Sequence, residues 1–289
     1  MSSNKISIVT ITYNSSKVID GYLRSILNNK KYVSELIIIE NGSSDAIYTK
    51  KVCIKYSKVL PIKYILNSNV GFGRSCNLGS HTAKSDYILF LNPDTELDIG
   101  SLKILLSEAI ASGADLIGGK SVNYENERHL TVVRKPNLNI GLFEFSNLGK
   151  LFNTDRGHVD FYYLDSMDVV SGKEDIEVDG LGGAFLMVKK ASFNKLGGFD
   201  ERFFMYLEDV DLSVRAKAQG MKIVYCPHST IKHIGGASSE SKYKIRHQAW
   251  YDSRRYFYRK HYGFCINIVV QPLYIVEEYL LKLREFFQK

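Results

Sequence analysis

Short apolar runs alternate with amphipathic segments along the first part of the chain. Residues 6–11 (ISIVTI) form a β-branched run, and residues 18–27 then show apolar positions at helical spacing. Two further apolar runs occupy residues 35–39 and 62–66, and each ends in a polar loop. Strands that alternate with helices predict an α/β fold with a Rossmann-like, mostly parallel sheet flanked by helices.

The polar loops after these three runs are expected to meet at one edge of the sheet, because parallel strands share their carboxyl ends. The loops comprise residues 12–14, 40–45 and 67–71. A nucleotide could lie across them, with Glu40 or Asn41 accepting a hydrogen bond from a pyrimidine N–H. Gly71 would permit close approach of the backbone.

A fourth run, residues 87–91 (YILFL), is apolar throughout and predicts a buried central strand. Pro93 ends this strand, so Asp94 is presented at its carboxyl end, where open α/β sheets bind ligands. A carboxylate at that place suits Mg²⁺ or Mn²⁺, which prefer oxygen ligands and share them with substrate phosphates. The alternative interpretation is an ordinary turn aspartate after a proline.

The segment from residue 197 to 236 combines an acidic cluster, a helix and a late histidine. Glu208, Asp209 and Asp211 follow an aromatic run and open a helical pattern that Gly220 ends. Burial beside aromatic residues can shift a carboxyl pKa, which is typical of catalytic acids and bases. Capping of the helix N-terminus is the alternative for at least one of the three.

Several longer motifs occur in the order found in a known enzyme family. They are SIVTITYN, IIIENGSSD, NVGFGRSCNLG, YILFLNPDTE and VDGLGGAFLMVKKASFNKLGGFDERFFMYLEDVDL, followed by the histidine of IKH. Over residues 5–240 the chain resembles glycosyltransferase family 2, and within it the bacterial rhamnosyltransferase-like branch. The NPDTE motif and the later EDVDL motif, at this separation, carry most of the resemblance.

The resemblance implies a GT-A fold and transfer of a sugar from a nucleoside diphosphate sugar with inversion, assisted by Mg²⁺ or Mn²⁺. Asp94 would bind the metal, and Asn92 stands where the motif has its first acid. His233 matches a late histidine that completes the metal site or contacts the diphosphate. Asp209 matches the catalytic base, and Glu208 beside it could raise its pKa or orient the acceptor.

The remaining site positions are assigned by the motifs and the polar loops together. Donor binding is expected at Ile11, Thr12, Tyr13, Glu40, Asn41, Ser43, Asn69, Gly71, Arg74, Asn77, Asn92 and Asp94. Acceptor binding is expected at Gly182, Gly183 and Glu208, although the two glycines could simply form a tight turn.

The 289 residues are expected to form a catalytic domain over residues 1–240, with a donor half at about 1–98 and an acceptor half at about 99–240. Residues 241–289 form a separate basic and aromatic segment, which predicts helices on an anionic membrane surface. The alternative is packing on the catalytic domain or on a second subunit in a homodimer. The apolar stretch 264–276 is too short to span a bilayer, so a cytoplasmic, peripheral location at the inner face of the plasma membrane is expected.

Other classes fit the sequence less well. The net charge of +7 is accompanied by no nucleic-acid-binding motif, so no nucleic-acid partner is expected. The cysteines show neither metal-ligand spacing nor a CxxC pair, which favours reduced thiols. A dehydrogenase would carry a Gly-x-Gly-x-x-Gly turn after the first strand, whereas Gly71 and Gly73 follow the third strand and Cys76 stands where the last glycine would be.

The favoured function is transfer of L-rhamnose from dTDP-rhamnose to a lipid-linked saccharide, with a polyprenyl diphosphate as the carrier. The pathway would be assembly of O-antigen or another surface polysaccharide. A galactofuranosyl- or other hexosyltransferase that uses a UDP sugar is the first alternative. A non-catalytic nucleotide-sugar-binding homologue is the second.

Overall fold

The computed structural model describes residues 5–146, 148, 162, 175–233 and 243–287. Four parallel strands form the N-terminal half of its main sheet, in the order β3-β2-β1-β4. They are β1 (Ile6–Thr12), β2 (Val33–Asn41), β3 (Ile62–Asn67) and β4 (Tyr87–Leu91). Each coincides with a predicted apolar run, so the doubly wound arrangement is confirmed.

The strand order reverses between β1 and β4, which pair with each other although β2 and β3 lie between them in the sequence. Neighbouring connections leave in opposite directions at such a point, and a crevice opens at the carboxyl ends of the two strands. Residues 12–14 and 92–94 therefore face a common opening.

The other half of the sheet is mixed in direction and continues in the order β11-β6-β12-β5. Strand β11 runs antiparallel to both β4 and β6, and β12 runs parallel to β6. The bounds are β5 (Thr95–Leu97), β6 (Leu116–Val122), β11 (Phe185–Lys189) and β12 (Ile223–His233). Short strands β7 (Arg128–His129) and β9 (Ile176–Glu177) extend it, and β8 (Val132–Val133) pairs with β10 (Gly180–Leu181).

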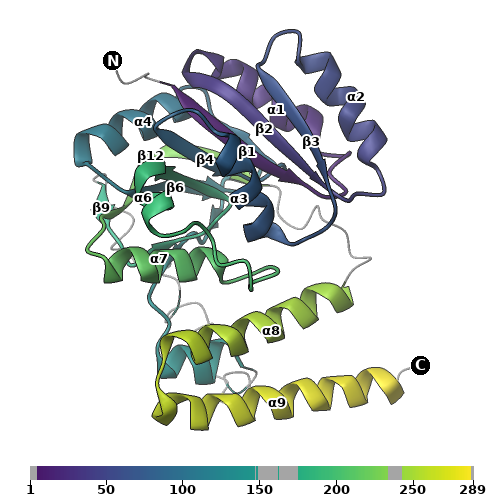
Figure 1. The fold of residues 1–289 in the computed structure, drawn as a ribbon, viewed down its shortest axis with the longest axis vertical. Coiled ribbons are helices and arrows are strands. Elements are labelled where there is room, and N and C mark those ends of the chain that lie inside the picture. Colours follow the sequence, from purple (N-terminus) through teal and green to yellow (C-terminus); the bar gives the residue numbers. More distant parts are fainter. Residues whose placement is uncertain (1–4, 147, 149–161, 163–174, 234–242, 288–289) are drawn as a thin grey trace.

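Helices cover both faces of the sheet (Figure 1). On one face lie α1 (Ile19–Asn28), α2 (Ala46–Tyr56) and α4 (Ser101–Ser112). On the other lie α3 (Phe72–Thr82), α6 (Lys190–Lys195) and α7 (Glu208–Ala218). Alternate residues of β1 supply the two cores, Ile6 and Ile8 to the first and Val9 and Ile11 to the second, as the pleat of a strand requires.

Helices α8 (Tyr243–His261) and α9 (Phe264–Phe287) lie against each other below the sheet domain, joined by a tight turn (Figure 1). Aromatic side chains that were expected at a lipid surface are mostly internal. Phe257, Tyr258 and Tyr274 are fully buried and join a third core with Phe145 and Phe203. For these residues the alternative, packing on the catalytic domain, is what the structure shows.

One of the basic residues is internal as well. Arg254 is 1% exposed and lies between the rings of Tyr251 and Tyr274. Its Nη1 donates to Glu277 Oε2 at 2.8 Å and to the carbonyl oxygen of Phe145. A buried guanidinium with this set of acceptors fixes the register of the two helices.

The length prediction for the last helix is wrong. Helix α9 continues well past residue 276, and its segment Phe264–Leu283 is long and apolar enough to cross a membrane by length and composition alone. The polar pair Glu277 and Glu278 interrupts the sequence pattern, but both carboxylates point toward arginines of α8. The outward side of the helix therefore stays apolar over residues 264–280.

Asp211 of α7 ties the sheet domain to α8. It is fully buried, and its Oδ1 accepts a hydrogen bond from His261 Nε2 at 2.7 Å and lies 2.5 Å from Lys260 Nζ. Its Oδ2 accepts from Arg215 Nε at 2.8 Å. Burial alone would raise the pKa of Asp211, but the bond from His261 and the charges of Arg215 and Lys260 outweigh burial and lower it.

Replacing Asp211 by asparagine is expected to lower the free energy of unfolding by about 3 kcal/mol, because it leaves buried cations without their carboxylate. A lowered pKa means that this stabilisation is present above the ordinary pKa and is lost as the pH falls through the folded-state value. Thermal unfolding at neutral and acidic pH measures both effects. The exposed Asp252→Asn is the matched control and should change stability by less than about 1 kcal/mol. Equal losses in the two variants would contradict a special role for Asp211.

Candidate functional site

A pocket of about 1010 Å³ opens at the carboxyl ends of β1, β2 and β4. Its far wall is formed by the turn before α7 and by the first turns of α8. Of the predicted site residues, the lining includes Ile11, Tyr13, Asn41, Asn69, Gly71, Asn92, Asp94, Gly182, Gly183, Glu208, Asp209 and His233. The volume is sufficient for a nucleotide sugar together with part of an acceptor.

Asp94 and His233 are brought together by strand pairing. Strand β5 follows Asp94 directly and runs antiparallel to the end of β12, where His233 pairs with Thr95. His233 Nε2 consequently lies 3.3 Å from Asp94 Oδ1, and both side chains are mostly buried. The ring of His129 stands edge-on to His233 at 5.3 Å between centroids. Burial, followed by the neighbouring His233, lowers the pKa of His129.

These residues fit a divalent cation only if substrate completes its coordination. Among the described residues, no group of three or more His, Cys, Asp or Glu side chains could hold a metal. One carboxylate oxygen and one imidazole nitrogen 3.3 Å apart leave most positions of an octahedral ion open. Mg²⁺ and Mn²⁺ commonly fill such positions with substrate phosphates and water. Asp94 and His233 are therefore suited to a cation that arrives with, or is held by, a diphosphate.

Asp209 lies in the first turn of α7 and faces the pocket. Its Oδ2 accepts a hydrogen bond from the Gly183 N–H at 2.7 Å, and its Oδ1 accepts from the Val210 N–H at 2.8 Å. A Cβ on Gly183 would meet Asp209 Oδ2 at 3.4 Å, an ordinary van der Waals distance, so the carboxylate packs directly against this residue. Burial raises the pKa of Asp209, while the backbone hydrogen bonds act in the opposite direction.

Glu208 precedes Asp209 and is 6% exposed. Its Oε2 has no hydrogen-bond partner among the described residues. Burial first, and the charge of Asp209 second, raise the pKa of Glu208 well above its usual range. A buried carboxyl without a cation is stable as the neutral acid, which leaves Asp209 as the charged member of the pair.

The Glu208 carboxyl gives a prediction about stability and pH. Because its pKa is raised on folding, the folded chain keeps a proton that the unfolded chain releases above its ordinary pKa of about 4.5. The associated stability is full below that value and is lost as the pH rises through the folded-state pKa. The loss is about 1.4 kcal/mol for each pH unit that separates the folded-state pKa from the unfolded-state pKa. Glu208→Gln removes this dependence.

We therefore expect the Glu208→Gln variant to unfold at a higher temperature than the wild type at pH 7, with the difference vanishing near pH 4. Melting curves at several pH values measure it, and Glu201→Gln, which changes an exposed carboxylate, is the control. A variant less stable than the wild type at pH 7 would show that Glu208 is ionised.

The turn before α7 holds two bulky residues in the left-handed region, with φ of 72° at Tyr206 and 65° at Leu207. Such conformations cost on the order of 1–3 kcal/mol each and persist only where packing enforces them. Leu207 is buried in the third core, and the Phe204 carbonyl accepts the Phe72 N–H at 2.9 Å. Gly71, at φ 95°, lies so close to that carbonyl that a Cβ would clash with it.

Five predicted donor-binding residues do not line the pocket. Their side chains hold its walls instead, and they are Thr12, Glu40, Ser43, Arg74 and Asn77. Glu40 is 1% exposed and accepts from Thr12 Oγ1 at 2.9 Å and from the Ser43 N–H at 2.9 Å. Asn77 exchanges two hydrogen bonds of 2.9 Å with the backbone of Phe199.

Arg74, which also does not line the pocket, lies on α3, and its Nε is 3.2 Å from Glu201 Oε2. Asn41 both lines the pocket and supports its wall through hydrogen bonds. It lines the pocket, and its amide binds Asn69 Oδ1 at 3.2 Å while its oxygen accepts from Ser75 Oγ at 2.9 Å. The ends of β2 and β3 are joined by this amide.

The structure adds pocket residues that the sequence analysis assigned no role. They come from the segment after β6, from Tyr162, from the turn before α7 and from α8, and include His129, Thr131, Glu144, Phe145, Tyr206, Arg246 and Trp250. The Trp250 ring packs edge-on against Phe145 at 5.1 Å and Tyr206 at 6.0 Å, and Arg246 Nε donates to the Tyr206 hydroxyl at 3.0 Å. Trp250 is the only tryptophan of the chain, a signal that could have drawn attention to α8.

The fold and the pocket are of the kind found in α/β enzymes that bind ligands at the carboxyl ends of their strands. Residues 7–167 match the family described as glycosyl transferase family 2, and residues 169–237 match a domain described as the N-terminal domain of galactosyltransferase. The chain belongs to glycosyltransferase family 2, and it is a glycosyltransferase.

Two bacterial relatives are similar over most of the chain. The N-acetylglucosaminyl-diphospho-decaprenol L-rhamnosyltransferase of Mycobacterium tuberculosis is 26% identical over 248 residues, which cover 79% of this chain and 75% of that protein. The rhamnosyltransferase WbbL of Escherichia coli K12 is 28% identical over 221 residues, 72% of this chain and 76% of that protein.

A solved structure supports the fold independently. GalNAc-T7, crystallised with UDP, GalNAc and Mn²⁺, superimposes with a TM-score of 0.58 at 14% identity, over 79% of this chain and 43% of that one. The chain thus spans less than half of that protein. The predicted GT-A fold is confirmed.

Proposed function

We propose that the chain transfers L-rhamnose from dTDP-rhamnose, with inversion, to a saccharide carried on a polyprenyl diphosphate. The observation that carries the proposal is one pocket in which Asp209 and the Asp94–His233 pair come from different elements. Both relatives are named rhamnosyltransferases, and the name of the first specifies a sugar on diphospho-decaprenol. Products of this kind of transfer build O-antigen or another surface polysaccharide.

In the proposed reaction Asp209 accepts the proton of the acceptor hydroxyl while that oxygen forms a bond to C1 of the donor sugar. The bond between C1 and the diphosphate oxygen breaks on the opposite face, and its electron pair leaves with the diphosphate. The two backbone N–H groups at Gly183 and Val210 hold the carboxylate in one orientation. Its raised pKa makes it a stronger base than a solvent-exposed aspartate.

A divalent cation at Asp94 and His233 would stabilise the charge that develops on the diphosphate. Asn92 begins the turn that presents Asp94, because its carbonyl accepts hydrogen bonds from the Thr95 hydroxyl at 2.7 Å and the Thr95 N–H at 3.3 Å. An amide in this position adds no negative charge. The proposal therefore includes a cation held more by the nucleotide sugar than by the protein.

The test is calorimetric binding of dTDP-rhamnose and a panel of UDP and GDP sugars, each with Mn²⁺ and with chelator, followed by analysis of the product anomer. Metal-dependent selection of dTDP-rhamnose with an inverted product is the expected result. Preference for a UDP hexose would instead support a hexosyltransferase that uses a UDP sugar, and the match of residues 169–237 to a galactosyltransferase domain favours this alternative. Binding without turnover on any acceptor would instead indicate a non-catalytic homologue.

A further inference from the structure

Helix α9 presents a continuous apolar face that nothing in the described part of the chain covers. Its exposed large apolar residues follow one another at spacings of four or seven positions along two adjacent rows: Phe264, Ile268, Ile275 and Tyr279, and Val269, Val276 and Leu280. Phe264 is 78% exposed, Ile275 54% and Leu280 57%. Isolated exposed apolar residues are ordinary, but a row of them along residues 264–280 of one helix is typical of an interaction surface.

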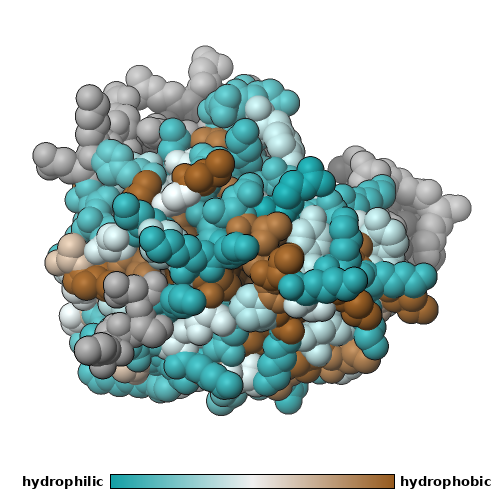
Figure 2. Space-filling view, turned by 90° about the horizontal axis from the view of Figure 1, so that it is seen from above, coloured by the Kyte–Doolittle hydropathy of each residue, from teal (hydrophilic) through white to brown (hydrophobic). Residues whose placement is uncertain are grey.

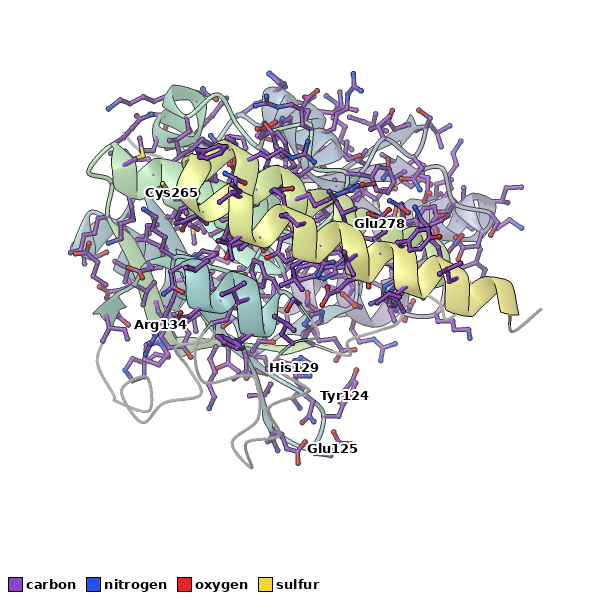
Figure 3. The ribbon with its side chains drawn as sticks, turned by 90° about the horizontal axis from the view of Figure 1, so that it is seen from below. Tyr124, Glu125, His129, Arg134, Cys265 and Glu278 are labelled. Carbon is purple, nitrogen blue, oxygen red and sulfur yellow. The ribbon has the colours of Figure 1, made fainter. Side chains whose placement is uncertain are left out.

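Over residues 264–280, no charged side chain is exposed on this face. The carboxylates of Glu277 and Glu278 are buried on the inner side, where Arg254 and Arg255 pair with them at 2.8 and 3.0 Å. Lys282 Nζ lies 2.7 Å from Glu278 Oε1 at the border of the face. Seen from below, α9 lies in front of the rest of the molecule (Figure 3). The opposite side of the molecule, seen from above in Figure 2, shows hydrophobic residues interrupted by hydrophilic ones.

The positive charge of the C-terminal region comes from residues 241–263, which have seven Lys and Arg and one Asp, whereas residues 264–289 have three charges of each sign. Residues 241–289 contain ten Lys and Arg but only four Asp and Glu, so they account for +6 of the net +7. An apolar face on α9, packed beside a helix that carries the excess positive charge, matches an anionic lipid surface, where each cation near the surface contributes on the order of 1 kcal/mol. A second copy of this chain would bring the same charge and repel it.

The pocket lies on the other side of α8 from α9. Exposed Ile245 and Arg246, in the first turns of α8, belong to its lining, and α9 is the outermost element in Figure 1. An in-plane helix sinks about 5–10 Å into the lipid boundary, and packed helices are about 8–10 Å apart. Sinking α9 by that depth brings α8, and the mouth of the pocket beside it, to the level of the lipid headgroups.

We propose that α9 lies in the plane of an anionic membrane with this face immersed, so that the pocket opens at the headgroup layer. The proposal rests on the proposed function in one respect: a lipid-linked diphosphate acceptor is the substrate that such a position would serve. Arg246, at the mouth, is placed to meet the acceptor's diphosphate.

Cys265 offers a direct probe of immersion. It is the exposed cysteine of the chain and lies near the start of α9, whereas Cys53, Cys76 and Cys226 are buried (Figure 3). The full chain, labelled there with a polarity-sensitive fluorophore, is mixed with vesicles of phosphatidylglycerol and phosphatidylethanolamine, or of phosphatidylcholine alone. A blue shift with the anionic vesicles only is expected. An unchanged spectrum with both would overturn the proposal.

Substitution separates apolar insertion from charge attraction. Ile275→Glu is expected to weaken binding to the anionic vesicles by about tenfold or more, because it removes an apolar side chain that the proposal places in lipid and adds a charge there. The control is Ile110→Glu on α4, where the isoleucine is similarly exposed at 50%, and it should change binding by less than about twofold. Emission of Trp250 reports whether both variants keep the helix pair folded. Equal binding by the two variants would reject immersion of α9.

If the apolar face of α9 instead binds a second copy of the chain, or if α9 crosses the bilayer, the experiments give different results. A dimer that Ile275→Glu dissociates, with no vesicle binding by the wild type, would assign the face to a second copy. Protein that resists extraction from the vesicles by alkaline carbonate would show a helix that crosses the bilayer instead of lying in it. The vesicle and dimer measurements do not depend on catalysis, so the membrane result can be interpreted even if the proposed donor or acceptor is wrong. In a separate assay, Ile275→Glu should transfer sugar to a water-soluble acceptor at the normal rate.

Discussion

Replacing Asp209 by asparagine is expected to lower kcat by about 100- to 10,000-fold while binding of the nucleotide sugar stays within about twofold. Asparagine keeps the size of the side chain and one oxygen for the Gly183 N–H, but it cannot take the proton of the acceptor. Transfer to a saccharide acceptor and calorimetric donor binding, measured on the same preparation, separate the chemical step from affinity.

The exposed Asp98→Asn is the control, and it should leave both quantities unchanged. The wild type should also lose kcat as the pH falls through the raised pKa of Asp209, because only the ionised carboxylate can act as a base. Near-normal turnover by Asp209→Asn would remove Asp209 from the reaction and direct attention to Glu208.

Asp94→Asn is expected to weaken donor binding on the order of 100-fold when Mn²⁺ is present and to leave it unchanged with chelator. The substitution removes the one carboxylate that faces this end of the pocket beside His233, so a cation bound with the diphosphate loses its charged protein ligand. Titration of dTDP-rhamnose under both conditions measures the effect.

His233→Ala tests the second ligand, and a loss smaller than that of Asp94→Asn is expected because imidazole carries no negative charge. If donor affinity in the wild type were the same with Mn²⁺ and with chelator, the metal role of both residues would be refuted. The variant should keep the β5–β12 pairing, since that pairing uses backbone atoms.

The sequence predicted those parts of the molecule that depend on local pattern. Strands β1, β2 and β4 appear in it as apolar runs because they are largely buried on both faces, and edge strand β3 is an apolar run although it is only partly buried. The alternation of strands and helices predicted that their polar loops share one edge of the sheet, and the crevice between β1 and β4 was added by the structure. The two acidic motifs were found because each directly follows or precedes such an element. Asp94 and Asp209 do line one pocket.

Which of the polar side chains reach the pocket depends on contacts between segments far apart in the sequence, and the sequence pattern does not show these contacts. Glu40 and Asn41 are neighbours at the end of β2 and looked equivalent in the sequence, yet only Asn41 lines the pocket. The side chain of Glu40 turns to the Thr12 hydroxyl and the Ser43 N–H, a choice set by the pleat of the strand and the path of the next loop. Trp250 reaches the pocket only because Arg254 and the aromatic core hold α8 beneath it.

The two left-handed residues before α7 also determine where that helix begins. A helix advances by about 100° and 1.5 Å per residue, so its first residue sets the direction in which every later side chain points. Tyr206 and Leu207 cannot be absorbed into α7 while they keep positive φ, and the helix must start at Glu208. Gaining or losing one residue in this turn would rotate Asp209 out of the pocket without altering the composition of the site, so the length of the turn is as much a requirement for activity as the carboxylate itself.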